Sequence, residues 1–369
     1  MKKNRLFMLL TLLMAAALVL TACGGDAEPE ATDVPAPEAT DVPPPPEPTD
    51  EPMAAIGSEE HPIKILFVPS VDVDELITGG DLVIAALSER TGLSFEVFVP
   101  TSYAATIEEM CASPDDTMGF IPGLGYILAN QLCGVDVAGK ATRFGYSWYA
   151  AMFVVQRDSD FATLEDLEGA SWAYPDASST SGYLYPNYLF QELGITPGET
   201  VEAGSHDNAM SAVYNGEVDF GTAFYSPPRV DGTAIEWVPG EPPDVPDDLV
   251  ASCANTEDDG TIMCGNWEVR DARRNIRRNV PDAVQMLRIL GTTSAITNDT
   301  LSFGPDFPAD VRQAVVDALF DFSENDPDGF AAAFDPYSWT AIEAATDADY
   351  DDIRFAVQAS GFSLEDLTE

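Results

Sequence analysis

Residues 179–182 read Ser-Thr-Ser-Gly and residues 204–207 read Gly-Ser-His-Asp, and each run lies where a predicted strand gives way to a predicted helix. Small hydroxyl residues at a helix start leave backbone N–H groups unpaired and pointing outward, and the helix dipole there favours negative charge. Together the two runs predict a pocket for a small oxyanion. Helix capping alone is the other interpretation, but three hydroxyl residues in a row exceed what one cap needs.

Strand and helix patterns alternate on both sides of these runs. Apolar residues at helical spacing separate the early strands, and a second series starts after the apolar run 149–155. Strands are expected at 63–68, 95–99, 118–121, 171–174, 201–203 and 218–223. Pro186 either lies in the first turn of its helix, or the regular helix begins there after a tight lead-in over 181–185. The alternation is typical of a parallel sheet, so the predicted fold class is α/β.

The N-terminus has the pattern of a lipoprotein signal peptide. Lys2, Lys3 and Arg5 precede an apolar run over 6–20, and small residues then lead to Cys23. The run is too short for a membrane span and lacks a basic far flank. We therefore expect residues 1–22 to be removed and Cys23 to be lipidated, which anchors the mature protein to the outer surface of a bacterial cell membrane.

A linker is expected after Cys23. Residues 26–53 contain nine prolines, nine acids and no Lys or Arg, so they cannot bury enough apolar surface to fold. The predicted linker covers residues 23–60, and the folded body is expected to start near His61.

Charge and length limit the function. The chain has 369 residues and a formal net charge of -46, which excludes nucleic acid and anionic membrane surfaces as partners. It does not exclude an anionic ligand, because surface charges are screened within about 8 Å at physiological salt. The body is long enough for one large or two medium domains.

The remaining cysteines favour disulfides over metal binding. Four cysteines follow Cys23, and an oxidising exterior favours their pairing. The local pairs Cys111 with Cys133 and Cys253 with Cys264 are the simplest of three connectivities, and four buried thiols are the alternative. With only His61 and His206 in the chain and no ligand spacing among the cysteines, we expect no metal site and no cofactor.

The chain resembles a known family. It is similar to the substrate-binding proteins of phosphonate, phosphite and phosphate ABC importers, a branch of the type II periplasmic-binding fold. The matching stretches are 98–105, 123–126, 163–169, 176–183, 204–207, 212–219 and 295–299, with Tyr350, Arg354 and Gly361 near the C-terminus. The combination of Ser-Thr-Ser-Gly with Gly-Ser-His is the most specific of these.

The resemblance implies two α/β lobes, each a mostly parallel sheet flanked by helices, joined by two crossing segments with the ligand between them. One lobe would combine residues 62–150 with 300–369, and the other would span 151–299. Closure by hinge motion is the expected response to ligand. The resemblance also implies a monomer that works with an ABC permease and its ATPase.

The resemblance further implies the ligand-binding residues. Hydroxyls and N–H groups of the serine run would hold three oxygens, and Asp299 would accept a hydrogen bond from a protonated ligand oxygen. The implied set is Ser179, Thr180, Ser181, His206, Tyr103, Tyr126, Asp299 and Tyr149, with Tyr146 as the alternative to Tyr149. Because none of these motifs contains Lys or Arg, neutral donors and helix dipoles are expected to supply the attraction.

Two departures from the family pattern narrow the prediction. Binders of aminoalkylphosphonates have an additional acid soon after the strand at 218–223, but residues 224–228 here read Phe-Tyr-Ser-Pro-Pro. This disfavours aminoethylphosphonate and leaves phosphate, phosphite or a small alkylphosphonate. An acidic, proline-rich insertion over about 229–281 is not explained by the family; we expect a solvated, partly disordered excursion joined by a disulfide, rather than a lid or docking surface.

Other functional classes remain as alternatives. A hydrolase with Ser181 as nucleophile and His206 as base is disfavoured because the serine lacks the glycine two positions earlier that a nucleophile elbow uses. A receptor that presents ligand to a sensor kinase has the same sequence features as an import protein. A ferric-ion binder would need several phenolates and a synergistic anion.

Overall fold

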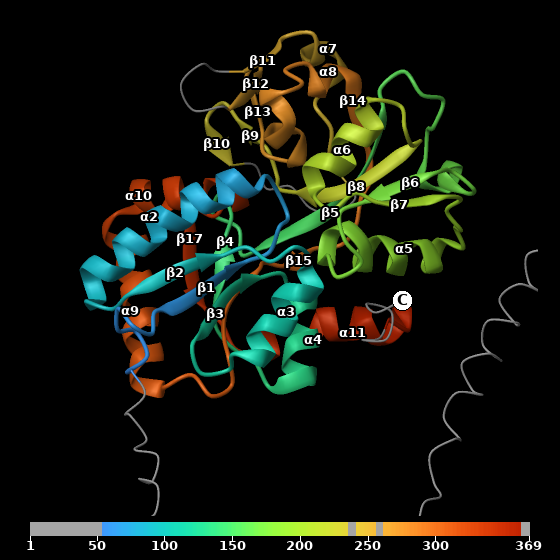
Figure 1. The fold of residues 1–369 in the computed structure, drawn as a ribbon. Coiled ribbons are helices and arrows are strands. Elements are labelled where there is room, and N and C mark those ends of the chain that lie inside the picture. Colours follow the sequence, from blue (N-terminus) through green and yellow to red (C-terminus); the bar gives the residue numbers. More distant parts are fainter. Residues whose placement is uncertain (1–53, 235–240, 256–260, 363–369) are drawn as a thin grey trace, which may run out of the picture. The chain divides into compact units, whose positions relative to one another are not determined.

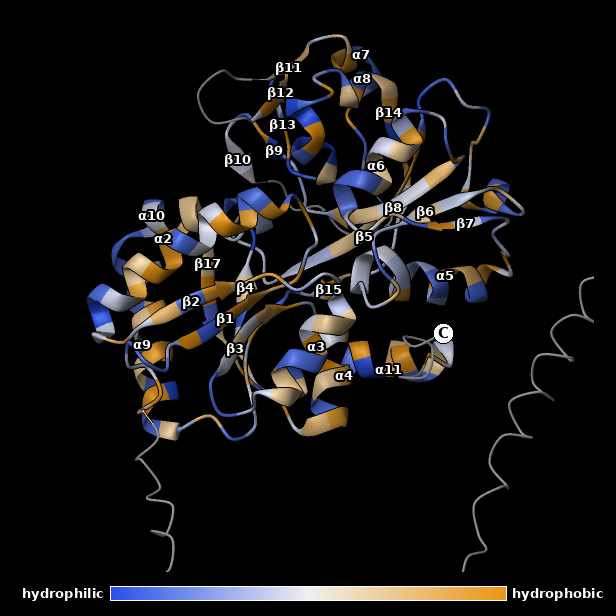
Figure 2. Ribbon diagram, in the orientation of Figure 1, coloured by the Kyte–Doolittle hydropathy of each residue, from blue (hydrophilic) through white to orange (hydrophobic). Residues whose placement is uncertain are grey.

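The computed structural model describes residues 54–234, 241–255 and 261–362. The expected signal peptide, the lipidation site Cys23 and most of the expected linker lie outside these residues. Within the described part of the chain, no helix is both long and apolar enough to cross a bilayer. Figure 1 shows the arrangement of the elements, and Figure 2 shows hydrophobic residues on both the strands and the helices that cover them.

The first lobe contains a mixed sheet in the order β17–β4–β16–β3–β1–β2. The pairs of β1 with β2 and β3 are parallel, whereas β16 runs antiparallel to both β3 and β4. These strands are β1 (Ile63–Phe67), β2 (Phe95–Phe98), β3 (Thr117–Ile121), β4 (Asp136–Thr142), β16 (Thr300–Phe303) and β17 (Ala341–Ala344).

Two groups of helices cover this sheet (Figure 1). One group packs together through contacts of α2 with α9 and α10; the other contains α3 and α4, with α11 against α4. The elements are α2 (Val73–Thr91), α3 (Tyr103–Ala112), α4 (Gly123–Cys133), α9 (Ala309–Asn325), α10 (Pro327–Ala333), η4 (Asp335–Tyr337), η5 (Asp347–Tyr350) and α11 (Asp351–Ser360). The N-termini of α3 and α4 contact the second lobe, because the Tyr103 N–H donates to Asp176 and the Leu124 N–H donates to the Thr180 hydroxyl.

The second lobe is built on the sheet β14–β5–β8–β6–β7, with β15 also paired to β5. Strands β8, β6 and β7 are parallel, and β5 is antiparallel to β8 and β14. The elements are β5 (Trp148–Gln156), η1 (Leu164–Leu167), β6 (Trp172–Tyr174), η2 (Thr180–Leu184), α5 (Tyr185–Leu193), β7 (Thr200–Glu202), α6 (His206–Tyr214), β8 (Phe220–Tyr225), α8 (Ala283–Met286), β14 (Leu287–Thr292) and β15 (Ile296–Thr297).

The chain crosses between the lobes twice, over residues 143–147 and 293–299. The strands that enter each lobe after a crossing, β5 and β16, run antiparallel to their neighbours, and β17 is antiparallel to β4, so both sheets are mixed. Asn298 joins the crossings, because its side-chain amide donates to the carbonyls of Ala141 and Tyr146. Tyr350 in turn donates to the Asn298 carbonyl at 3.0 Å.

The described residues of the insertion are folded, so the expected solvated excursion is wrong for them. They form an antiparallel sheet in the order β10–β9–β13–β12–β11, with its own apolar cluster that includes Val245, Ile262 and Val269. The elements are β9 (Arg229–Val230), β10 (Thr233–Ala234), α7 (Asp247–Val250), β11 (Cys253–Asn255), β12 (Ile262–Cys264), β13 (Trp267–Val269) and η3 (Ala272–Arg278). The composition was misleading because a few apolar residues on paired strands suffice for a small core.

Both local disulfides are present. Cys253 and Cys264 are directly opposed on β11 and β12, and Cys111 in α3 is bonded to Cys133 at the end of α4. The folded body also begins earlier than His61, which corrects the end of the expected linker. Ile56 packs against the core, and the Gly57 N–H donates to the His61 carbonyl at 2.7 Å.

Candidate functional site

A small cavity of about 30 Å³ lies between the two lobes. This volume is far below the several hundred Å³ of a typical drug-sized site, so the cavity favours a small ligand. The cavity is lined by Val68, Ser70, Tyr103, Pro122, Arg143, Asp299 and Tyr337 from the first lobe and the crossings, and by Tyr149, Ser179, Ser181, His206 and Phe224 from the second lobe. Six of the eight residues implied by the resemblance therefore meet at one place.

The serine run forms a π-type turn before α5. Ser179 is the N-cap of this turn, and its hydroxyl accepts a hydrogen bond from the Gly182 N–H at 3.0 Å. A Cβ on Gly182 would lie 2.2 Å from the Pro175 ring, so only glycine fits there. The regular helix begins at Tyr185, and Pro186 lies in its first turn, as one interpretation expected. The turn over Thr180–Leu184 precedes it as a tight lead-in, as the other interpretation expected. Such π-type turns are frequent at functional sites.

His206 is the first residue of α6. Its N–H donates to the Ser70 carbonyl of the first lobe at 2.9 Å, and Ser205 caps the helix. The imidazole is buried, and its Nδ1 has no hydrogen-bond partner. Burial, with a smaller contribution from the nearby Arg143 charge, lowers the pKa of His206 to about 3. The imidazole is therefore neutral at physiological pH.

Arg143 corrects the expectation that only neutral donors line the pocket. Its guanidinium is almost fully buried, forms an ion pair with Asp299 through Nη2, and donates through Nε to the Tyr337 carbonyl at 3.1 Å. Nη1 is buried with no hydrogen-bond partner. The guanidinium also lies 4.6 Å from the ring centre of Tyr149. Motif comparison missed Arg143 because it lies in the first crossing and belongs to none of the matched stretches.

Tyrosines form much of the cavity wall. Tyr103 begins α3 and Tyr149 lies in β5, and both are almost fully buried. Burial is the main cause that raises the pKa of each phenol above its ordinary value, so both remain protonated donors. Tyr337, which the sequence did not indicate, donates its hydroxyl to the Val68 carbonyl at 2.7 Å. Tyr149, rather than Tyr146, is the aromatic that reaches the cavity.

Two expected residues lie elsewhere. The Thr180 hydroxyl accepts a hydrogen bond from the Leu124 N–H at 2.9 Å, so it joins the serine run to the start of α4. Tyr126 points away from the cavity, because its hydroxyl donates to Asp347 and its ring packs against Tyr350. Thr180 is therefore a contact between lobes, and Tyr126 belongs to the packing around α11.

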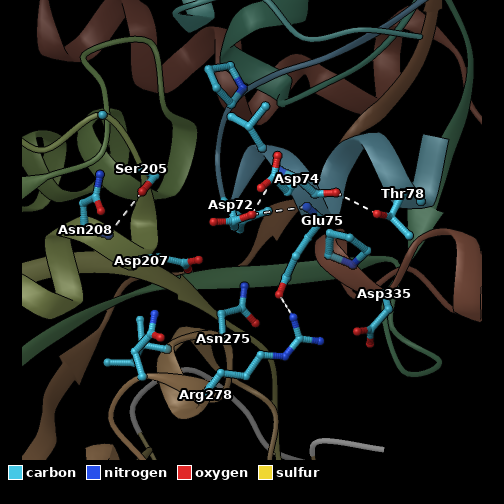
Figure 3. A pocket seen from close by; sticks show the side chains of 18 of the residues that line it. Asp72, Asp74, Glu75, Thr78, Ser205, Asp207, Asn208, Asn275, Arg278 and Asp335 are labelled. Carbon is cyan, nitrogen blue, oxygen red and sulfur yellow. Dashed lines mark hydrogen bonds and ion pairs between the residues drawn. The ribbon is translucent and has the colours of Figure 1, made fainter. Parts of the chain in front are cut away.

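A larger groove of about 1000 Å³ is lined by residues that neighbour cavity residues in sequence, such as Pro69 beside Val68 and Asp207 beside His206 (Figure 3). Side chains of Asp72, Asp74, Glu75, Asp207 and Asp335 line it, and Arg278 is the only basic residue among its lining residues. We call this feature the acid-lined groove. Although it is larger than the cavity, its carboxylates repel anions, so the cavity is the better oxyanion site. Within the described residues, no cluster of His, Cys, Asp and Glu could hold a metal ion.

Comparison with known proteins identifies the family of this chain. The model of the family described as "ABC transporter, phosphonate, periplasmic substrate-binding protein" matches residues 65–350. The chain belongs to this family. Members of the phosphonate substrate-binding family are binding proteins, and the match includes both lobes and both crossings.

The individual relatives described next have low sequence identity to this chain. The phosphate-import protein PhnD of Mycolicibacterium smegmatis is 27% identical over 237 residues, which cover 60% of this chain and 65% of that protein. The chain thus matches somewhat less than two thirds of this relative's length. Two solved structures share the fold. One is a binding protein component of an ABC phosphonate transporter from Pseudomonas aeruginosa, with a TM-score of 0.62 and 17% identity over 81% of this chain and 86% of that chain. The other is PhnD1 from Prochlorococcus marinus in complex with methylphosphonate, with a TM-score of 0.59 and 15% identity over 80% of this chain and 97% of that chain.

Proposed function

We propose that this protein is an extracytoplasmic solute-binding lipoprotein that captures a small phosphorus oxyanion in the interlobe cavity and delivers it to an ABC importer. The candidate ligands are phosphate, phosphite and a small alkylphosphonate. Lipidated Cys23 would anchor the protein to the membrane, and an ABC permease with its ATPase would receive the ligand.

One observation carries the proposal. Arg143 Nη1 and His206 Nδ1 are both buried without a hydrogen-bond partner, and both residues line the same cavity. Leaving a buried polar group unpaired costs about 1–3 kcal/mol, and more for a charged group. An anion that accepts from Arg143 and from an Nδ1-protonated imidazole would remove both costs. The hydroxyls of Ser179 and Ser181 supply further contacts.

Shape and composition support the class of ligand. The cavity of about 30 Å³ suits an ion of a few heavy atoms rather than a nucleotide or an amino acid. Phe224 lines the cavity, and residues 224–228 contain no acid that could hold an amine, which disfavours aminoethylphosphonate. A hydrolase is disfavoured as well, because an imidazole with a pKa of about 3 is a poor general base at neutral pH.

Thermal unfolding with added ligand tests the proposal. A ligand at 100 times its Kd stabilises the folded state by about 2.7 kcal/mol, which raises the melting temperature measurably. We expect shifts with at least one of phosphate, phosphite and methylphosphonate, and none with aminoethylphosphonate. The Ser179→Ala, Ser181→Ala double variant should lose the shift, and Ser159→Ala, whose hydroxyl donates to the Gln156 carbonyl, should keep it. Lack of any shift in the unmodified protein would contradict the proposal.

A further inference from the structure

The insertion concentrates positive charge beside the first crossing. Residues 270–278 include five arginines, although the whole chain has only 17 Lys and Arg. This segment is fixed to the second lobe, because Asp244 accepts from both Arg157, which follows β5, and Arg273 of η3, at 2.9 and 2.6 Å. The insertion therefore moves with the second lobe, and its other arginines can hold residues of the crossing and of the first lobe.

The first crossing contains a tight two-residue turn. Arg143 and Tyr146 exchange two backbone hydrogen bonds of 2.9 Å. The residues between them, Phe144 and Gly145, have φ values of 53° and 92°. A turn of this kind needs positive φ at both central residues, which glycine and asparagine adopt readily and phenylalanine does not. Phe144 therefore needs a tertiary contact to keep this conformation.

Arg270 of the insertion supplies this contact. Its guanidinium carbon lies 4.2 Å from the centre of the Phe144 ring, and its side chain is 2% exposed. Nε donates to Glu268 at 3.0 Å, but Nη1 is buried without a hydrogen-bond partner. The attraction between a cation and an aromatic face is strongest where water is excluded, so it compensates part of the buried charge and holds the ring in place.

Arg274, one turn further along η3, holds a second residue with positive φ. Ser338 has a φ of 57°, and its hydroxyl accepts from Arg274 Nη1 at 3.0 Å. The residue before it is Tyr337, whose carbonyl accepts from Arg143 Nε at 3.1 Å. Phe144 directly follows Arg143 in the chain. The two arginines of the insertion thus hold the residue after Arg143 and the residue after its hydrogen-bond acceptor.

We propose that the insertion positions Arg143 through the contact of Arg270 with Phe144, which makes these two side chains positioning residues for oxyanion binding. Neither of them lines the cavity. Arg143 does, with its unpartnered Nη1, so a small rotation of the turn would move this donor relative to the bound oxyanion. The inference rests on the proposed function and gives the insertion a role in it. An insertion that only added stability would leave the affinity unchanged.

Substitutions at Phe144 separate positioning from folding. Phe144→Asn removes the ring but suits the positive φ, so its melting temperature should stay close to that of the unmodified protein. Calorimetry should show about five- to thirtyfold weaker phosphate binding, because the contact between cation and ring is lost. Phe144→Tyr keeps the ring and should bind phosphate to within about twofold of the unmodified protein. Unchanged affinity in Phe144→Asn would overturn the inference.

Arg270→Met completes a double-mutant cycle. This substitution removes the charge but leaves Glu268 paired with Arg229, and it should weaken phosphate binding about as much as Phe144→Asn. The double variant should then bind no more weakly than Phe144→Asn alone, whereas multiplied effects would show that the two residues act independently and would overturn the inference. Phe144→Asn and Phe144→Tyr decide the question if Arg270→Met does not fold.

Arg90→Met is the matched control. The Arg90 guanidinium lies 4.8 Å from the centre of the Phe322 ring and pairs with Asp321, and all three residues belong to helices of the first lobe. Its removal takes away the same kind of contact, so the melting temperature should fall while phosphate affinity changes less than about twofold. A loss of affinity as large as that of Arg270→Met would overturn the inference, because it would show a general effect of lost stability.

The Arg143 side chain can also be followed without ligand. Its Nε–H resonance, assigned as the one that disappears in Arg143→Gln, should shift or broaden in Phe144→Asn and Arg270→Met but not in Arg90→Met. An unchanged resonance in Phe144→Asn and Arg270→Met would overturn the inference and leave the proposed function intact. No binding of phosphate, phosphite or methylphosphonate by the unmodified protein would instead overturn the proposed function and the inference with it.

Discussion

Replacing Arg274 by methionine should weaken oxyanion binding, although Arg274 does not line the cavity. Arg274 belongs to η3 of the second lobe, and its Nη1 donates to the Ser338 hydroxyl of the first lobe at 3.0 Å. Its Nη2 pairs with Asp335, and the guanidinium lies 5.9 Å from the ring of Phe144 in the first crossing. These contacts join the lobes and should exist only when the cleft is closed.

The structure gives the size of the effect. Ser338 is buried, so a hydrogen bond to its hydroxyl from a charged donor contributes about 1–2 kcal/mol. The side chain of Asp335 is 47% exposed, so this ion pair adds less than about 1 kcal/mol. A loss of about 1–2 kcal/mol from the closed state corresponds to about a 5- to 30-fold weaker affinity. The change should be in the dissociation rate, since encounter precedes closure.

Arg278→Met is the matched control. Arg278 also pairs across the cleft, with Glu75 at the edge of the acid-lined groove, but its side chain is 62% exposed (Figure 3). Its removal should change the affinity less than about fivefold. Stopped-flow binding and calorimetry with phosphate measure both variants. Equal effects of the two substitutions, or a change confined to the association rate of Arg274→Met, would refute the reasoning.

Three further predictions concern other parts of the fold. Gly182→Ala should weaken phosphate binding at least about tenfold in calorimetry, because the new Cβ would displace the serine turn from Pro175. Asp207 has a folded-state pKa of about 7, above that of the unfolded chain, so the folded state binds more protons. The stability of the protein should therefore fall as pH rises from about 4 to 7. Asp207→Asn should flatten this slope in thermal melts, and an unchanged slope would contradict the prediction. Replacing Cys253 and Cys264 by serine should lower the free energy of unfolding by about 3 kcal/mol, measured with denaturant. Phosphate affinity should change less than about threefold, because the disulfide lies in the small sheet of the insertion. A loss of binding would contradict this placement.

The sequence predicted the elements with strong local signals. Strand positions, the start of α6 at His206 and the serine turn follow from apolar runs and capping residues near in sequence. The local disulfides agree with the simplest pairing of four cysteines. The meeting of Ser179, His206, Tyr103 and Asp299 came from the family resemblance rather than from any periodic pattern.

Other features could not be predicted because they depend on distant contacts. Arg143 lies beside Asp299 only because Asn298 joins the two crossings, and nothing in the local sequence distinguishes it from a surface arginine. Tyr126 resembled a ligand residue, but its partner Asp347 is 221 positions away. The composition of the insertion predicted a solvated segment, because its many acids and prolines outnumber the few apolar residues that pack in its small core.

A crystal structure of the protein grown with phosphate would test the central claim most directly. The account predicts one phosphate in the interlobe cavity, with its oxygens within hydrogen-bond distance of the Ser179 and Ser181 hydroxyls and of Arg143 Nη1, and one oxygen facing Asp299. Phosphate bound in the acid-lined groove or on the surface, with the cavity residues contacting only water, would contradict it.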